Sequence, residues 1–133
     1  MGGKLEAEGL IKSFGRGFGN VVLAGLTLHA DEGEFVSIIG PSGSGKSTLF
    51  HMIGGLIRPD EGRILLDGKE ITGRRGQVSY MPQSDTLLPW RTVLDNVTLE
   101  LEIAGGVSRR EAREAAREWL EKVGLGGYER AYP

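Results

Sequence analysis

The sequence contains no cysteine and only two histidines among its 133 residues. The absence of cysteine excludes a disulfide framework and a thiolate metal site. His29 and His51 are too few and too far apart to indicate a zinc site, and we expect them on a strand face and a helix face. No apolar run approaches the ~20 residues of a membrane span, and residues 1–4 lack the apolar region of a signal peptide. We therefore expect a soluble cytoplasmic protein.

The chain also lacks an excess of either charge. The chain has 16 Lys and Arg residues and 18 Asp and Glu residues, which gives a net charge of −2. This balance provides no electrostatic footprint for nucleic acid or for an anionic membrane. At this length, a single domain over residues 1–133 is expected, and it can bury roughly two-thirds of its unfolded surface.

Glycine is abundant, and one glycine-rich stretch carries the strongest signal in the sequence. Gly40–Thr48, GPSGSGKST, fits G-x-x-x-x-G-K-[ST] at every fixed position. The apolar, β-branched run 34–39 before it predicts a buried strand. Residues 48–53 after it predict the start of a helix, which Gly54 and Gly55 would end. Strand, glycine loop and helix in this order are the structural context that a phosphate-binding loop requires.

The chemistry of this stretch favours a phosphate ligand. Glycines let successive backbone N–H groups turn toward phosphate oxygens, and a helix N-terminus adds roughly half a positive charge. Lys46 would reach the β- and γ-phosphates, and the Ser47 hydroxyl would ligate Mg²⁺. The alternative is a plain glycine turn between a strand and a helix, which does not require a lysine followed by two hydroxyl residues.

The rest of the chain predicts strands first and helices later. Strands are expected over residues 5–11, 21–23 and 26–30, and over 77–81. A hairpin over 63–66 and 69–71 is predicted around Asp67-Gly68. One helix is expected to begin at Thr92, where Thr92 and Asp95 form a loose capping arrangement. Its residues Leu94, Val97 and Leu101 share one face. Another is expected over 109–123, with a capping box at Ser108 and Glu111 and a stop at Gly124. The predicted apolar stripe of this last helix comprises Ala112, Ala115, Ala116, Trp119, Leu120 and Val123.

Taken together, these segments resemble the ATP-binding subunit of an ABC transporter. Residues 26–34 lead into Gly40–Thr48 as in that family, residues 62–68 follow, and Tyr80-Met81-Pro82-Gln83 resembles the strand that ends in the Q-loop glutamine. The stretch 87–97 resembles importers of nitrate, sulfonate, taurine and similar small solutes. The resemblance implies an α/β fold of the P-loop NTPase class: an antiparallel β subdomain, a fragment of the P-loop core and the start of an α subdomain. It also implies ATP and Mg²⁺ as ligands.

Site residues follow from the resemblance position by position. The phosphate-binding residues would be Gly40, Pro41, Ser42, Gly43, Ser44, Gly45, Lys46, Ser47 and Thr48. Phe14 would lie against the adenine ring, with Phe18 as a rival and ordinary packing or exposure as the alternative. Gln83 would complete the Mg²⁺ shell together with Ser47, and a surface glutamine is the alternative. Leu87–Trp90 would receive the membrane-spanning subunit, and a loop of the core is the alternative.

Departures from the family pattern limit the expected activity. The signature segment LSGGQ, the second acidic strand motif and the switch histidine have no counterpart in residues 1–133. Asp67 after Ile64-Leu65-Leu66 does not supply the acidic motif, because Gly68 stands where the catalytic glutamate belongs. Hydrolysis requires a carboxylate that polarises the attacking water, so we expect nucleotide binding without hydrolysis.

Further expectations concern assembly and alternatives. Members of the family pair with a second ATP-binding subunit and lie at the inner membrane when assembled. Residues 1–133 match the N-terminal part of such a domain, so we expect an unpaired edge or an uncovered apolar face beside the strand at 35–39, and a helix at 109–123 that lacks part of its packing partner. The chain is therefore expected to self-associate, or to exchange a strand or a helix between copies. A nucleotide kinase is an alternative, although Arg74-Arg75 is too little for its arginine-rich lid. An inert folded fragment is another alternative.

Overall fold

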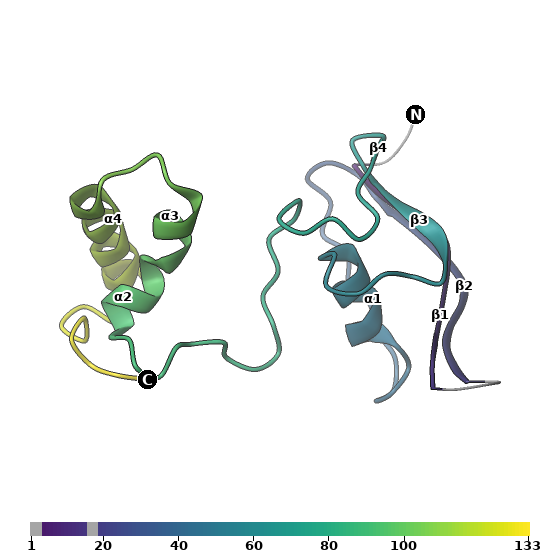
Figure 1. Cartoon of the computed structure of the whole chain (residues 1–133), viewed down its shortest axis with the longest axis horizontal. Helices are drawn as coiled ribbons and strands as arrows, with labels where there is room; N and C mark the ends of the chain where they lie inside the picture. The colour runs from purple at the N-terminus through teal and green to yellow at the C-terminus, as the bar shows by residue number, and fades with distance from the viewer. Residues whose placement is uncertain (1–3, 16–18) are drawn as a thin grey trace. The chain divides into compact units, whose positions relative to one another are not determined.

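The computed structural model describes residues 4–15 and 19–133. These residues form two compact units, which are divided between Met81 and Pro82. Each unit is described by itself below (Figure 1).

The first unit is built on a four-stranded antiparallel sheet with the order β2-β1-β3-β4. Its strands are β1 (Leu5–Phe14), β2 (Asn20–Ala30), β3 (Glu61–Leu66) and β4 (Lys69–Glu70). The predicted strands near the N-terminus are confirmed, and the two pieces expected over 21–30 are one strand. The predicted hairpin is also confirmed. Its turn residues Asp67 and Gly68 have φ values of 50° and 71°, as a tight two-residue hairpin turn requires.

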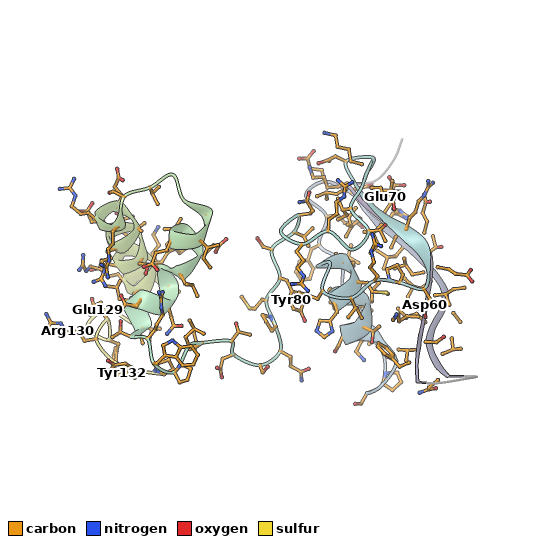
Figure 2. The ribbon with its side chains drawn as sticks, viewed as in Figure 1. Asp60, Glu70, Tyr80, Glu129, Arg130 and Tyr132 are labelled. Atoms are coloured by element: carbon orange, nitrogen blue, oxygen red, sulfur yellow. The ribbon has the colours of Figure 1, made fainter. Side chains whose placement is uncertain are left out.

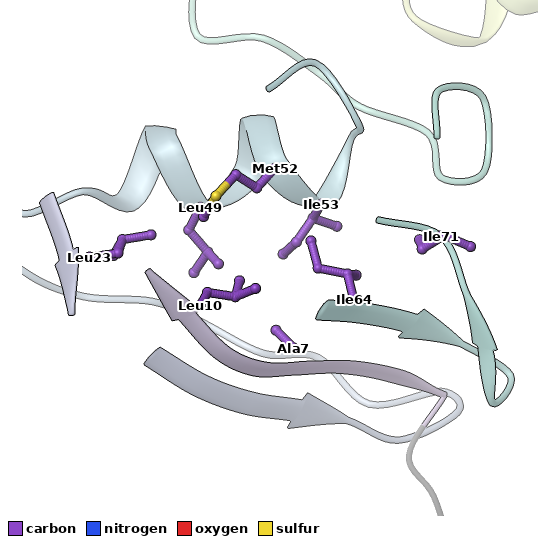
Figure 3. Close-up of a cluster of buried hydrophobic side chains, with 8 residues drawn as sticks. All are labelled: Ala7, Leu10, Leu23, Leu49, Met52, Ile53, Ile64 and Ile71. Atoms are coloured by element: carbon purple, nitrogen blue, oxygen red, sulfur yellow. The ribbon is translucent and has the colours of Figure 1, made fainter. Parts of the chain in front are cut away.

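One helix, α1 (Lys46–Ile53), packs on one face of this sheet and builds the core (Figure 3). Leu49, Met52 and Ile53 point from α1 toward the strands. They meet buried side chains of the sheet and of the segment after β4, namely Ala7, Leu10, Leu23, Ile64 and Ile71. The predicted helix after the glycine loop is confirmed, and its cap at Gly54 is followed by Gly55 with φ 69°. Burial of this apolar face fixes the direction in which the N-terminus of α1 points.

Two predicted strands are absent from the sheet. Residues 34–39 and 77–81 have no strand structure, so both predictions were wrong for the described chain. A strand exists only where a neighbour completes its ladder of hydrogen bonds, and neither segment pairs with a strand in the described residues. Several of the apolar side chains on which these two predictions rested are instead exposed to solvent. Phe35, Ile39 and Met81 are 92%, 94% and 93% exposed.

The second unit contains α2 (Val93–Val97), α3 (Leu99–Ala104) and α4 (Arg109–Lys122). The single helix predicted from Thr92 is divided at Thr98, which is fully buried. The single proton of the Thr98 hydroxyl has two acceptors, the Asp95 carbonyl at 3.2 Å and the Glu102 carboxylate at 3.1 Å. Such local bonds compete with a regular helix. Within residues 4–15 and 19–133, no helix is long and apolar enough to cross a bilayer.

The predicted caps of this unit are confirmed, and part of the predicted stripe is wrong. Ser108 and Glu111 form a complete capping box at the start of α4, and Thr92 caps α2 through the Asp95 N–H. The core of the unit comprises Leu94, Ala116 and Leu120. Trp119 and Val123 are 61% and 64% exposed. Val123 is the C-cap residue just beyond the end of α4, and the described residues of this unit cover neither side chain.

An acidic residue ties the end of β1 to the start of β3. Asp60, labelled in Figure 2, accepts a hydrogen bond from Lys12 Nζ at 2.6 Å and another from the Ser13 N–H at 2.7 Å. The Asp60 N–H donates to the Ile11 carbonyl at 2.8 Å. The hydrogen bond from Lys12, followed by that from Ser13, holds the pKa of the Asp60 carboxyl below its ordinary value. The ionised carboxylate therefore favours the folded state.

We predict that Asp60→Asn lowers the melting temperature at pH 7. We also predict that the melting temperature of this variant decreases less than that of the wild type when the pH is lowered. Because the folded-state pKa of Asp60 is lowered, its contribution is present above the ordinary aspartate pKa and is lost as the pH falls through the folded-state value. Thermal unfolding followed by circular dichroism between pH 7 and pH 3 measures both effects. Asp85→Asn, in an exposed loop, is the control. Equal melting curves for both variants would contradict the role given to Asp60.

Candidate nucleotide-binding site

The glycine loop connects the unpaired segment 34–39 to the N-terminus of α1. Two of its glycines, Gly43 and Gly45, have φ values of 78° and 89°, in the left-handed region that other residues adopt at a cost. Gly45 is also the N-cap of α1, and no side chain caps this helix end. The loop therefore leads directly into the N-terminus of α1, and no side chain accepts a hydrogen bond from the first N–H groups of the helix.

The consequence is a cluster of unpaired donors. Among the described residues, the backbone N–H groups of five loop and helix residues donate to no protein acceptor. These residues are Gly43, Gly45, Lys46, Ser47 and Thr48. The Ser47 hydroxyl likewise has no hydrogen-bond partner in the described part of the chain, and its residue is exposed. Donors of this kind at a helix N-terminus are suited to an anion with several oxygens.

Lys46 places its ammonium group over the same loop. Its Nζ donates to the Gly40 carbonyl at 2.7 Å, the Pro41 carbonyl at 2.6 Å and the Ser44 hydroxyl at 3.1 Å. All three partners are neutral, and no carboxylate of the described chain forms an ion pair with Lys46. Its positive charge therefore remains uncompensated at the loop, which favours a negatively charged ligand.

Close packing against β2 holds the loop in this shape. A Cβ atom built at Gly45 would lie 3.0 Å from side-chain atoms of Val22 and Leu23. At Gly40 it would lie 2.9 Å from the Ser44 hydroxyl. Beside the loop is a pocket of about 280 Å³, which Leu23, Ile38, Lys46 and Leu49 help to line. The loop thus packs closely on β2 at Gly45 and on itself at Gly40.

Phe14 ends β1 at the same end of the sheet. Lys12 lies opposite Leu23 in the ladder, and Leu23 is one of the two β2 residues that approach Gly45. Phe14 lies two residues farther along β1 and is 46% exposed. Lys12 Nζ is 5.5 Å from the centre of its ring. The rival ring, Phe18, lies outside the described residues.

Gln83 and Leu87–Trp90 belong to the second unit. Gln83 is exposed. Leu87 and Trp90 are 48% and 72% exposed, so this loop is not part of a core.

The sequence did not single out Asn96, which fixes this loop. The Asn96 side chain accepts a hydrogen bond from the Leu88 N–H and donates to the carbonyls of Leu88, Arg91 and Thr92. An asparagine within a helix often bonds nearby backbone, and this is the signal that could have revealed it.

Comparison with known families agrees with the geometry of the loop. A family model described as ABC transporter matches residues 23–132. This chain belongs to the ABC transporter family. The match includes the whole glycine loop, and it favours this family over the nucleotide-kinase alternative.

The relatives are ATP-binding proteins of ABC transporters. An uncharacterized ABC transporter ATP-binding protein from Methanocaldococcus jannaschii is 45% identical over 98% of this chain and 49% of its own length. The lipoprotein-releasing system ATP-binding protein LolD from Cereibacter sphaeroides is 44% identical over 97% of this chain and 62% of its own. The taurine import ATP-binding protein TauB from Pseudomonas aeruginosa is 42% identical over 94% and 48%. The chain spans about half the length of the curated relatives it matches.

Solved ABC cassettes share the fold. The dimeric structure of the bacterial ABC transporter cassette MJ0796 covers 97% of this chain and 61% of its own, with a TM-score of 0.86 and 32% identity. A dimeric post-hydrolysis state of the same cassette, bound to ADP and Pi, has a TM-score of 0.84 and 32% identity. The predicted fold class, a P-loop NTPase of the ABC type, is confirmed. The described chain is a partial domain with an antiparallel sheet and a few helices.

We predict that alanine is tolerated less well at Gly45 than at Gly43. Both substitutions place a side chain in the left-handed region, which costs about 1–2 kcal/mol. Only Gly45→Ala meets neighbours within 4 Å, whereas nothing lies that close to a Cβ at Gly43. Overpacking adds about 1–3 kcal/mol, so Gly45→Ala should melt several degrees lower than Gly43→Ala. Equal melting temperatures would show that the loop does not pack against β2 as described.

Proposed function

We propose that this chain binds Mg-ATP through Gly40–Thr48. The observation that carries the proposal is the set of five unpaired backbone N–H groups at the N-terminus of α1, beside a lysine whose partners are all neutral. These amides would hold the phosphate oxygens, and Lys46 would donate to the β- and γ-phosphates in place of the loop carbonyls. Pro41, Ser42 and Ser44 complete the turn that presents the amides.

The donor set also suits a magnesium ion on the nucleotide. The free Ser47 hydroxyl is an oxygen ligand of the kind that Mg²⁺ prefers, and Mg²⁺ commonly binds through few protein groups together with phosphates. The metal would neutralise charge on the phosphate oxygens. We assign the Gln83 side-chain amide oxygen as a second protein ligand, directly or through a water. This assignment rests on the resemblance of Tyr80–Gln83 to the Q-loop.

The position of Phe14 supports a role in base binding. The ring is half exposed, and Asp60, through Lys12 and Ser13, fixes the end of β1 that carries it. An exposed ring on a fixed strand end can stack on an adenine base, which is worth about 0.5–1.5 kcal/mol beyond area burial.

For the whole protein, we propose an ATP-binding subunit that drives transport of a small solute into the cell. The stretch 87–97 and the likeness to TauB support import, whereas LolD is named for lipoprotein release. The exposed loop Leu87–Trp90, fixed by Asn96, would contact the membrane-spanning subunit. A second ATP-binding subunit and a cytoplasmic position at the inner membrane complete this assembly. Residues 1–133 alone are proposed to bind nucleotide without hydrolysing it.

The test is calorimetry with Mg-ATP on Lys46→Ala. Removing the ammonium group leaves the backbone amides in place and deletes the charge on the β- and γ-phosphates. We expect the dissociation constant to rise at least about tenfold, which corresponds to ~1.4 kcal/mol. Lys69→Ala, an exposed lysine of the same unit, should bind as the wild type does. Equal affinity of Lys46→Ala and the wild type would exclude the proposed site.

A further inference from the structure

The end of strand β1 that carries Phe14 is held differently from the rest of the strand. The ladder between β1 and β3 ends at Ile11, whereas the ladder between β1 and β2 continues to Phe14. Beyond Ile11, the carboxylate of Asp60 accepts hydrogen bonds from the Lys12 ammonium at 2.6 Å and from the Ser13 N–H at 2.7 Å. One acidic side chain therefore binds the two residues that immediately precede the aromatic ring.

Lys12 contacts the ring as well as the carboxylate. Its Nζ lies over the Phe14 ring, 5.5 Å from the ring centre. An ammonium group within about 6 Å of a ring centre is attracted to the face of that ring. The Lys12 side chain is 17% exposed, whereas Phe14 is 46% exposed. The ammonium group is thus largely shielded from solvent, and the ring remains accessible to a ligand.

The charge of Lys12 is compensated, which distinguishes it from the lysine of the glycine loop. Lys12 forms an ion pair with Asp60, whereas the hydrogen-bond partners of Lys46 are all neutral. A compensated charge attracts a phosphate group less than an uncompensated one. The contacts of Lys12 therefore favour a role at the ring over a role as a second phosphate ligand.

We propose that Lys12 is a positioning residue for the nucleotide base. Held by Asp60, its ammonium group covers one face of the Phe14 ring and leaves the other face to the base. This inference rests on the proposed role of Phe14 in the nucleotide site. A ring that is fixed before binding loses less conformational freedom when a base stacks on it, which increases affinity. Lys12 thus contributes to ATP affinity through Phe14, without contact with the ligand.

The test is calorimetry with two ligands, Mg-ATP and Mg-tripolyphosphate, because only ATP carries a base. Lys12→Met removes the charge and keeps a long, unbranched side chain. We expect its dissociation constant for ATP to rise about threefold, which corresponds to part of the stacking energy. Its dissociation constant for tripolyphosphate should stay unchanged. Lys12→Arg should restore ATP affinity, because a guanidinium group can also pair with Asp60 and lie over the ring.

A second lysine–aspartate pair provides the matched control. Lys4 Nζ lies 2.8 Å from the Asp67 carboxylate, just before the start of β1. Lys4→Met therefore removes an ion pair of the same kind at the other end of the strand, and it should bind ATP as the wild type does. A double-mutant cycle tests whether Lys12 acts through the ring. In a Phe14→Ala background, Lys12→Met should cause no further loss of ATP affinity.

The two ligands separate failure of this inference from failure of the nucleotide site. Unchanged ATP affinity in Lys12→Met, with tripolyphosphate still bound, would overturn this inference alone. An equal loss of affinity for both ligands, or a full loss that persists in the Phe14→Ala background, would also overturn it, because Lys12 would then not act through the ring. A wild type that binds neither ligand would overturn the proposed function together with this inference.

Discussion

The site depends on the packing of one glycine, Gly45, against strand β2. This residue has a left-handed backbone, and side-chain atoms of Val22 and Leu23 lie 3.0 Å from the position that a Cβ atom would take. It is also the N-cap of α1, so the same contact sets where the helix begins and leaves its first N–H groups unpaired. The packing of Gly45 against β2 thus determines where the unpaired N–H groups of the loop and of α1 lie.

The antiparallel sheet supplies the support for this arrangement. Leu49, Met52 and Ile53 fix α1 on the inner face of the sheet, and Leu23 belongs both to that core and to the wall behind Gly45. At the same end of the sheet, Asp60 holds the last residues of β1 through Lys12 and Ser13. The glycine loop and Phe14 are therefore held at the same end of the sheet in the first unit.

Features with a local cause could be predicted from the sequence. The glycine loop followed by a helix, the Asp67-Gly68 turn and the caps at Thr92 and Ser108 each follow from a few neighbouring residues, and the structure has all of them. The strands at 34–39 and 77–81 could not be judged in this way, because a strand requires a partner that local sequence does not reveal. Trp119 has the helical spacing of a core residue, but its exposure depends on what lies beside α4. The division of the helix at Thr98 follows from side-chain bonds to Asp95 and Glu102 that hydrophobic periodicity does not register.

The most direct test of the account is a titration of the isotope-labelled chain with Mg-ATP, followed through the backbone amide signals by nuclear magnetic resonance. If the unpaired N–H groups form the phosphate site, the signals of Gly43, Gly45, Lys46, Ser47 and Thr48 should shift most. The signals of α4 should change little. Unchanged signals at these five residues, at ATP concentrations that saturate binding, would contradict the assignment of the loop as the nucleotide site.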